Sequence, residues 1–465
     1  MQPLDVVINA ARIDSAGPLR NVAIRAGRIV AISTADEPLG EAAAVIEANG
    51  RWTIPGAIDT HSHMGELAPE YHHLPGLSRE TNFEWETRGA IAGGVTTALN
   101  YAKFGQGSMV DAVEESLRLA GPQTRMNIQF HGYIMNESQL QEVPAAVAAG
   151  VRTFKMFMPY RGAEASALGG IGSLNHSQLE RAFRAIAAQG CQALVHAEDG
   201  DIVEHCTREQ TGLGMPSLDS YEHSRPARAE GDAALSAIYL AEQAGCPVTI
   251  VHVSSLEAIR ARRAVGYPDV TLESCPHYLM LSTDSDIGPR GKVAPPIRAR
   301  SLRDRLSEAL VAGEFDFFGS DHNEWPAEAK DTFIDGRAGL PGIGLLLPLL
   351  LTQVVDRCGL SMETAIALSS RNAALRFGLP GKGIVAVGAD ADLVVLDTGP
   401  HVVRAADLLS PVDYSPYEDE VLGYWPAATL CGGRIVYRDG TIVDDDFRGE
   451  LINLRYRSQT SNNSL

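Results

Sequence analysis

Short β-rich runs alternate with helical segments through the middle of the chain, and this alternation limits the possible folds more than any other feature. The helical segments, such as SQLERAFRAIAAQG and DAALSAIYLAEQAGC, carry apolar residues at helical spacing and reach a glycine near their ends. The predicted strands cover residues 53–59, 95–100, 127–132, 151–157, 193–197, 248–253, 270–275 and 316–321. Eight βα units in succession predict an α/β fold, a distorted TIM (β/α)8 barrel.

The two ends of the chain have a different pattern from its middle. NVAIRAGRIVAI near the start and ATLCGGRIVYRDGTIV near the end are strand-like segments joined by glycine turns. We therefore predict that residues 1–54 and 372–465 form one small β-sandwich domain, and that residues 55–371 form the barrel between its two parts.

Charge and hydropathy exclude several classes of partner. The formal net charge of −19 argues against binding to nucleic acid or anionic lipid. No apolar run approaches the ~20 residues that span a bilayer, and the start of the chain does not resemble a signal peptide. The six cysteines form no CxxC pair, which is typical of reduced thiols in a cytoplasmic protein. We expect a cytoplasmic protein that contacts neither nucleic acid nor membrane.

Metal-binding residue types gather where the predicted barrel strands end, which is where the reactive residues of such barrels lie. The HSH pair points its two imidazoles to the same side of an extended strand, where they can share a metal. The candidates are His61, His63, Lys155, His196, His252 and Asp321. A single histidine at such a place generally packs in the core, but six candidates on five strands of one barrel predict a metal site.

Lys155 lies inside the apolar run VRTFKMF, where a buried ammonium is costly. The residues alone leave several explanations open. The lysine could extend its amine to solvent, form a buried ion pair, serve as a Schiff-base amine, or carry a modification that removes its positive charge.

The motifs HSH, FK, HAE, HVS and SDH occur in an order that resembles the cyclic amidohydrolases, the group of hydantoinases, dihydropyrimidinases and allantoinases. The resemblance runs through nearly the whole chain. It includes GRWTIPGAIDTHSH, AGGVTT, TFKMFMPY, VHAED, ESCPHYLMLSTD, KVAPPIR, FGSDH, KGIVAVGADADLVVLD and SPYEDEVLGYW.

The resemblance implies two divalent metals, with zinc as the expected metal. It implies that His61, His63 and Asp321 bind one metal, that His196 and His252 bind the other, and that Lys155, carboxylated by CO2, bridges them together with a hydroxide. The hydroxide would attack the ring amide, and Asp321 would act as the catalytic general base and then acid. The implied substrate contacts are Tyr160, which could instead be a loop residue packing on a lid, and Ala294 of KVAPPIR.

The resemblance leaves the substrate open between related cyclic amides. The leading expectation is hydantoin or dihydropyrimidine hydrolysis, and the alternatives are an allantoinase or a cyclic imide hydrolase. Dihydroorotases resemble this family but carry an arginine soon after HxH, which HSHMGEL lacks. His277 in CPHYL is closer to the allantoinases, whereas the KVAPPIR motif is closer to the hydantoinases. A non-enzymatic scaffold is disfavoured because all six ligand positions are filled, and the family implies a homotetramer. His131 and His322 receive no assigned role.

Overall fold

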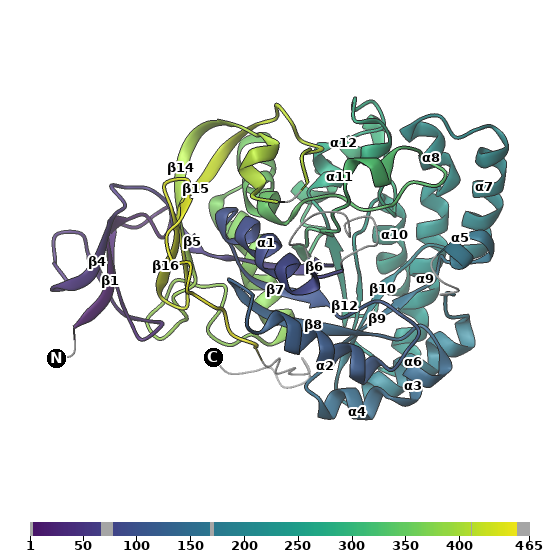
Figure 1. Ribbon diagram of the computed structural model, residues 1–465, viewed down its shortest axis with the longest axis horizontal. Helices are drawn as coiled ribbons and strands as arrows, with labels where there is room; N and C mark the ends of the chain where they lie inside the picture. The colour runs from purple at the N-terminus through teal and green to yellow at the C-terminus, as the bar shows by residue number, and fades with distance from the viewer. Residues whose placement is uncertain (1–2, 67–77, 168–171, 411, 453–465) are drawn as a thin grey trace.

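The computed structural model describes residues 3–66, 78–167, 172–410 and 412–452, and its centre is an eight-stranded sheet nearly closed into a barrel (Figure 1). Neighbouring strands pair in parallel and follow one another in chain order. The barrel strands are β6 Ala57–Ser62, β7 Val95–Tyr101, β8 Asn127–Tyr133, β9 Thr153–Phe157, β10 Gln192–His196, β11 Val248–Ile250, β12 Val270–Ser274 and β13 Phe317–Phe318. The predicted barrel is confirmed.

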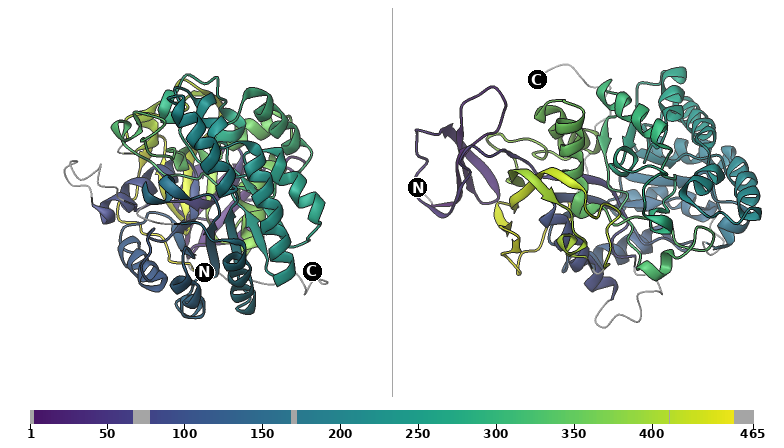
Figure 2. Two further views of the ribbon diagram at one scale, coloured as in Figure 1. Left: turned by 90° about the vertical axis from the view of Figure 1, so that its right-hand side faces the viewer. Right: turned by 90° about the horizontal axis from the view of Figure 1, so that it is seen from above.

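Helices surround the barrel strands on the outside (Figure 2). The α-helices between the first and last barrel strands are α1 Arg79–Ala92, α2 Met109–Ala120, α3 Glu137–Gln141, α4 Val143–Ala148, α5 Gly162–Ala167, α6 His176–Ala188, α7 Gly200–Gly212, α8 Leu218–Ser224, α9 Ala227–Ala244, α10 Leu256–Val265, α11 His277–Met280 and α12 Arg300–Val311. Helix α6 shows why such a segment packs against the barrel. Its buried residues form one apolar stripe at helical spacing: Leu179, Ala182, Phe183 and Ile186. The helix begins after Asn175, whose side chain accepts the N–H of Gln178.

The first and last barrel strands meet at a narrow closure. Ser62 forms an isolated parallel bridge with His322, and the N–H of His63 donates to the carbonyl of His322 at 2.8 Å. Gly319 makes this approach possible, because a Cβ at that position would lie 2.7 Å from the Cβ of His61. The closure brings the end of β6 next to the segment that follows β13.

The two chain ends form the β-sandwich, as predicted. The N-terminal sheet has the order β3-β2-β1-β4, and the other sheet has the order β17-β16-β15-β14-β5. The strands are β1 Leu4–Ala11, β2 Arg20–Arg25, β3 Arg28–Thr34, β4 Ala42–Glu47, β5 Thr53–Pro55, β14 Leu393–Val402, β15 Val421–Cys431, β16 Arg434–Arg438 and β17 Thr441–Ile442. Ile8 and Ile24 of the first sheet share a core with Val395 and Leu430 of the second, and the purple and yellow segments of Figure 1 lie side by side. The exact domain boundaries at 54/55 and 371/372 stay a prediction.

The predicted strand 53–59 is divided in the structure. β5 pairs antiparallel with β14 of the sandwich, whereas β6 begins after Gly56 and pairs with β7 of the barrel. A Cβ at Gly56 would lie 2.2 Å from the hydroxyl of Thr96, so the break falls at a position where only glycine fits.

The helical segment after the barrel returns to the barrel interior. It comprises α13 Leu346–Leu351, α14 Met362–Ile366 and α15 Asn372–Phe377, with π-helical turns η5 Thr352–Arg357 and η6 Ala367–Arg371 and a short 3-10 helix η4 Ile343–Leu345 before them. Further 3-10 helices are η2 Gly288–Gly291, η3 Ala327–Lys330 and η7 Ala405–Leu408. Arg376 donates to the carbonyl of Val248, the first residue of β11, at 3.0 Å, and Phe377 packs on Phe317 with ring centroids 5.6 Å apart. Helix α15 therefore closes the end of the barrel at which the strands begin.

We expect Phe377→Ala to lower the free energy of unfolding by about 3–5 kcal/mol, because it leaves a cavity in a core that cannot fully collapse. Phe377 is 1% exposed, whereas Leu375 on the same helix is 76% exposed. Leu375→Ala is therefore the matched control and should change stability by no more than about 0.5 kcal/mol. Denaturant midpoints of the two variants measure the difference, and equal midpoints would contradict this role of α15.

No helix in the described part of the chain combines the length and the apolar character needed to cross a membrane.

Candidate metal centre

The six residues that the sequence singles out lie together at one end of the barrel. His61 lies in β6 and Lys155 in β9, His196 ends β10, and His63, His252 and Asp321 follow β6, β11 and β13. Five of the six are buried, with at most 7% of each residue exposed, and His63 is partly buried. The carboxyl ends of five strands thus converge on one buried polar cluster.

Short distances connect the members of the cluster. His61 Nε2 lies 3.2 Å from Asp321 Oδ1 and 3.4 Å from Lys155 Nζ. His63 Nε2 lies 3.7 Å from the same Asp321 oxygen. The His252 ring centroid lies 5.1 Å from that of His61 and 4.4 Å from that of His196. Ligand atoms of His61, His63 and Asp321 fall within 4.8 Å of one another, so these three residues could share one ion.

Two buried glutamates orient two of the imidazoles. His61 Nδ1 donates to Glu273 Oε1 at 2.7 Å, and His196 Nε2 donates to Glu198 Oε2 at 2.7 Å. Each bond uses the N–H of the neutral ring and leaves the other nitrogen with a free lone pair, which is the arrangement of a metal-binding histidine. Sequence reasoning did not select either glutamate. The signals were present, because Glu198 follows His196 by two residues and Glu273 lies in the buried strand β12.

The cluster also contains a polar atom without a partner. His252 Nδ1 is buried and has no hydrogen-bond partner among the described residues. A buried polar atom without a partner is costly unless a ligand satisfies it. Imidazoles, a carboxylate and an amine able to become a carbamate form a donor set that suits zinc and similar divalent metals. The residues therefore fit a metal centre.

Burial sets the ionisation of the cluster. It lowers the pKa of His61, His196 and His252, so these rings are neutral and available as ligands near neutral pH. Burial also lowers the pKa of the Lys155 ammonium and raises that of the Glu273 carboxyl. Burial also acts to raise the pKa of Glu198. The Arg225 guanidinium and the hydrogen bond from His196 outweigh this effect and lower the Glu198 pKa to about 2.

The backbone is strained at two of the candidate ligands. His252 has φ 41° and Asp321 has φ 49°, in the left-handed region that residues other than glycine rarely adopt. Such conformations cost on the order of 1–3 kcal/mol and concentrate at functional sites. Here each one follows a short strand and turns the chain at the end of the barrel.

The predicted substrate contacts lie on loops at this end of the barrel. The Tyr160 ring centroid is 5.7 Å from that of His196 and 5.1 Å from that of Phe157, so Tyr160 is next to the cluster. Ala294 is partly buried on the segment between η2 and α12, joined to Pro295 by a cis peptide bond. Its contact with a substrate stays a prediction.

The three histidines without an assigned role have different surroundings. His131 uses both ring nitrogens inside the protein, one with Thr153 Oγ1 and one with the carbonyl of Thr60 at 3.2 Å. His277 is 1% exposed and its Nε2 has no partner among the described residues. His322 Nδ1 accepts the N–H of Gly342 at 3.0 Å, so its Nε2 carries the proton in the neutral ring.

His322 belongs to a second cluster of metal-binding residue types, together with Glu86 and Glu324. Their ligand atoms also lie within 4.8 Å of one another. Burial raises the pKa of Glu86 to about 8 and that of Glu324 to about 7. Because the neutral ring carries its proton on Nε2, this nitrogen, 3.4 Å from Glu86 Oε1, has no lone pair available to a metal. This cluster is better explained as two carboxyls that retain protons near a neutral imidazole.

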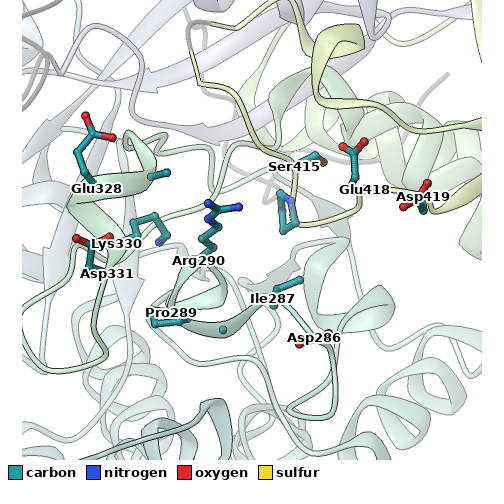
Figure 3. A pocket seen from close by; sticks show the side chains of 13 residues that line it. Asp286, Ile287, Pro289, Arg290, Glu328, Lys330, Asp331, Ser415, Glu418 and Asp419 are labelled. Atoms are coloured by element: carbon teal, nitrogen blue, oxygen red, sulfur yellow. The ribbon is translucent and has the colours of Figure 1, made fainter.

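A separate pocket of about 710 Å³ lies between the segments 286–290, 327–331 and 415–419 (Figure 3). None of the six cluster residues lines it. The lining includes residues of both charge signs, so it favours no single sign of ligand charge. They are Arg290, Lys330, Asp286, Glu328, Asp331, Glu418 and Asp419.

Comparisons with known proteins agree with this geometry. The family model described as the amidohydrolase family matches residues 52–436. The L-hydantoinase of Paenarthrobacter aurescens is 31% identical and aligns with 97% of this chain and 98% of its own length. The allantoinase of Rubrobacter xylanophilus is 33% identical over 95% of this chain and 96% of its own.

Solved structures match over the same length. A structure described as the L-hydantoinase (dihydropyrimidinase) from Arthrobacter aurescens has a TM-score of 0.86 at 30% identity and covers 97% of this chain and 100% of its own. A D-hydantoinase structure has a TM-score of 0.87 at 27% identity, covering 98% of this chain and 100% of its own. Matches of this extent, over a barrel with this cluster at its end, show that the chain belongs to the amidohydrolase family.

Proposed function

We propose that this chain is a hydrolase that opens the ring of a five- or six-membered cyclic amide, of the hydantoin or dihydropyrimidine type. The observation that carries the proposal is the convergence of four histidines, a lysine and an aspartate on one buried cluster at the carboxyl end of the barrel. The hydantoinase and allantoinase relatives support a cyclic amide as the substrate class.

We propose two metal positions in the cluster, with zinc as the metal. One ion would be held by His61, His63 and Asp321, and the other would be held by His196 and His252. A carboxylated Lys155 would bind both ions. When bound, such a pair of divalent ions lowers the pKa of water and polarises a carbonyl group.

Carboxylation of Lys155 accounts for a buried lysine among imidazoles. The ammonium first loses one proton, and the neutral amine nitrogen then adds to CO2. A nitrogen–carbon bond forms as one carbon–oxygen π bond breaks, and the nitrogen loses a second proton, so a positive group becomes a negative carbamate. Burial favours the uncharged amine that this addition needs. The carbamate has two oxygens, one for each proposed metal position.

Two side chains would serve the reaction directly. Asp321 would accept the proton of the attacking hydroxide and deliver it to the ring nitrogen that leaves. Tyr160 would donate its hydroxyl proton in a hydrogen bond to the oxygen that becomes negative as the carbonyl is attacked. Burial raises the pKa of Tyr160, which keeps that proton in place.

The proposal is tested with zinc-loaded protein assayed against hydantoin, dihydrouracil, allantoin and a cyclic imide. We expect close to two zinc ions per chain and ring opening of hydantoin or dihydrouracil. His252→Ala should lose metal and activity together, because it removes a nitrogen ligand from a buried site. Full activity after exhaustive chelation would contradict the metal-dependent mechanism.

Allantoin hydrolysis is the second candidate, favoured by the allantoinase relative and by His277 in CPHYL. Cyclic imide hydrolysis is a further alternative within the same chemistry. The same assay distinguishes these candidates, because each one predicts that a different substrate of the panel has the highest kcat/KM. A homotetrameric assembly, a cytoplasmic location and the absence of nucleic-acid and membrane partners remain part of the proposal.

A further inference from the structure

A buried arginine connects two parts of the candidate site that lie on different elements. Arg225 follows α8 and is 2% exposed. Its NH2 group donates to Glu198 Oε2 at 2.6 Å, and its Nε lies 3.2 Å from each oxygen of that carboxylate. Its NH1 group donates to Glu164 Oε1 at 2.6 Å. One guanidinium therefore holds two carboxylates in a fixed relative position.

The two carboxylates belong to different functional segments. Glu198 is fully buried and accepts the Nε2–H of His196, a candidate metal ligand. Glu164 lies in α5, four residues after Tyr160. The path from His196 to the Tyr160 segment thus runs through Glu198, Arg225 and Glu164.

A second buried arginine holds Arg225 itself in place. Arg298 NH1 donates to the carbonyl of Arg225 at 2.6 Å, and Arg298 is 1% exposed. Arg298 also donates to Ser254 Oγ at 2.9 Å, and the Ser254 hydroxyl in turn donates to Glu230 Oε2 at 2.7 Å. These four residues are each at most 2% exposed, and in such surroundings hydrogen bonds are strong and an unpaired polar group is costly.

We propose that Arg225 is a positioning residue that sets the His196 ring and the Tyr160 segment at the same time, through Glu198 and Glu164. This inference rests on the proposed function, because it concerns the same site. Its consequence is that one substitution, made outside the six-residue cluster, weakens metal binding on the His196 side and misplaces the tyrosine.

The first test measures metal release, not activity. Full-length zinc-loaded protein is mixed with a chromogenic chelator, and the loss of each ion is followed. Loss of a residue that orients a metal-binding histidine typically weakens metal affinity by about 10–100-fold. In R225M we expect two separate phases, in which one of the two ions leaves about 10–100-fold faster than in the native protein.

R125M is the matched control for this measurement. Arg125 is also 2% exposed and also paired with a glutamate, Glu84 at 2.6 Å, but it precedes β8 at the opposite end of the barrel. R125M should therefore lower stability without changing the release of either ion. R225K keeps the charge but loses the planar fork, so its release rate should fall between the native protein and R225M even if R225M folds poorly.

The second test concerns the Tyr160 side. E164Q should lower kcat, by up to about 10²-fold for a misplacement of about 1 Å, with little change in KM, because the tyrosine is proposed to act on the transition state. In a Tyr160→Phe background E164Q should have no further effect on kcat, since coupled residues are not additive. An equal loss in both backgrounds would show that Glu164 does not act through Tyr160.

The results of these tests distinguish a failure of the proposed function from a failure of the role proposed for Arg225. Native protein that binds no zinc, or opens no cyclic amide, would refute the proposed function. Native protein that binds two zinc ions, while R225M and R225K release both ions at the native rate, would overturn the role of Arg225 and leave the proposed function standing.

Discussion

Lys155→Ala is expected to lose the binding of two metals and all measurable ring opening. The lysine is 1% exposed, and its Nζ lies 3.4 Å from His61 Nε2 and 4.9 Å from the centroid of the Tyr101 ring. A bare ammonium there would repel two dications strongly, because screening is weak in a buried site. The carbamate reverses this charge, and alanine supplies neither oxygen. Metal content and kcat on the best substrate of the panel measure the loss.

Chemical rescue sharpens the test of Lys155. Acetate or propionate should enter the space left in Lys155→Ala and restore part of the rate. Lys155→Arg should not respond, since the guanidinium fills the space and stays charged. Mass measurement under native conditions checks the modification directly. A fully active protein with two metals and an unmodified Lys155 would overturn both the carbamate and the bridging position proposed for it.

Asp321→Asn is expected to lower kcat by roughly 10²–10⁴-fold, the range for loss of a positioned general base. Asparagine keeps the size of the side chain and an oxygen near His61 and His63, which lie 3.2 and 3.7 Å from Asp321 Oδ1. We therefore expect most of the metal to remain. Metal analysis beside steady-state kinetics distinguishes the two effects, and an unchanged kcat would show that another group moves the proton.

The barrel was predictable because its strands are apolar runs of strand length that alternate with helical patterns. The ends of the strands were less predictable. The predicted strands 248–253 and 316–321 are shorter in the structure, as β11 ends at Ile250 and β13 at Phe318. In both cases the positive φ of a candidate ligand, His252 or Asp321, follows the strand end. Hydrophobic patterning carries no signal for such a turn, because the pattern indicates which residues are buried and not the φ of a single residue.

The six cluster residues were predictable for a simple reason: each lies at or just after a strand that the sequence marks. Glu273, Glu198 and Arg225 were not selected, although they contact the cluster or its supports. Their importance depends on which partner lies across the barrel, such as His61 opposite Glu273, a pair separated by 212 positions in the chain. Charged residues are common in such sequences, and only the closed fold shows which of them are buried against an imidazole.

The closure between β6 and the segment after β13 has a consequence for the order in which the site is assembled. Asp59 and Ser320 are hydrogen-bonded across it, 261 positions apart, with Ser320 N–H donating to Asp59 Oδ1 at 2.9 Å. Translation delivers the amino-terminal part first, at about 5–20 residues per second. His61 and His63 therefore emerge from the ribosome many seconds before Asp321 exists. A nascent chain stalled before the eighth strand would hold most of the barrel and still be unable to complete the first of the two proposed ion positions.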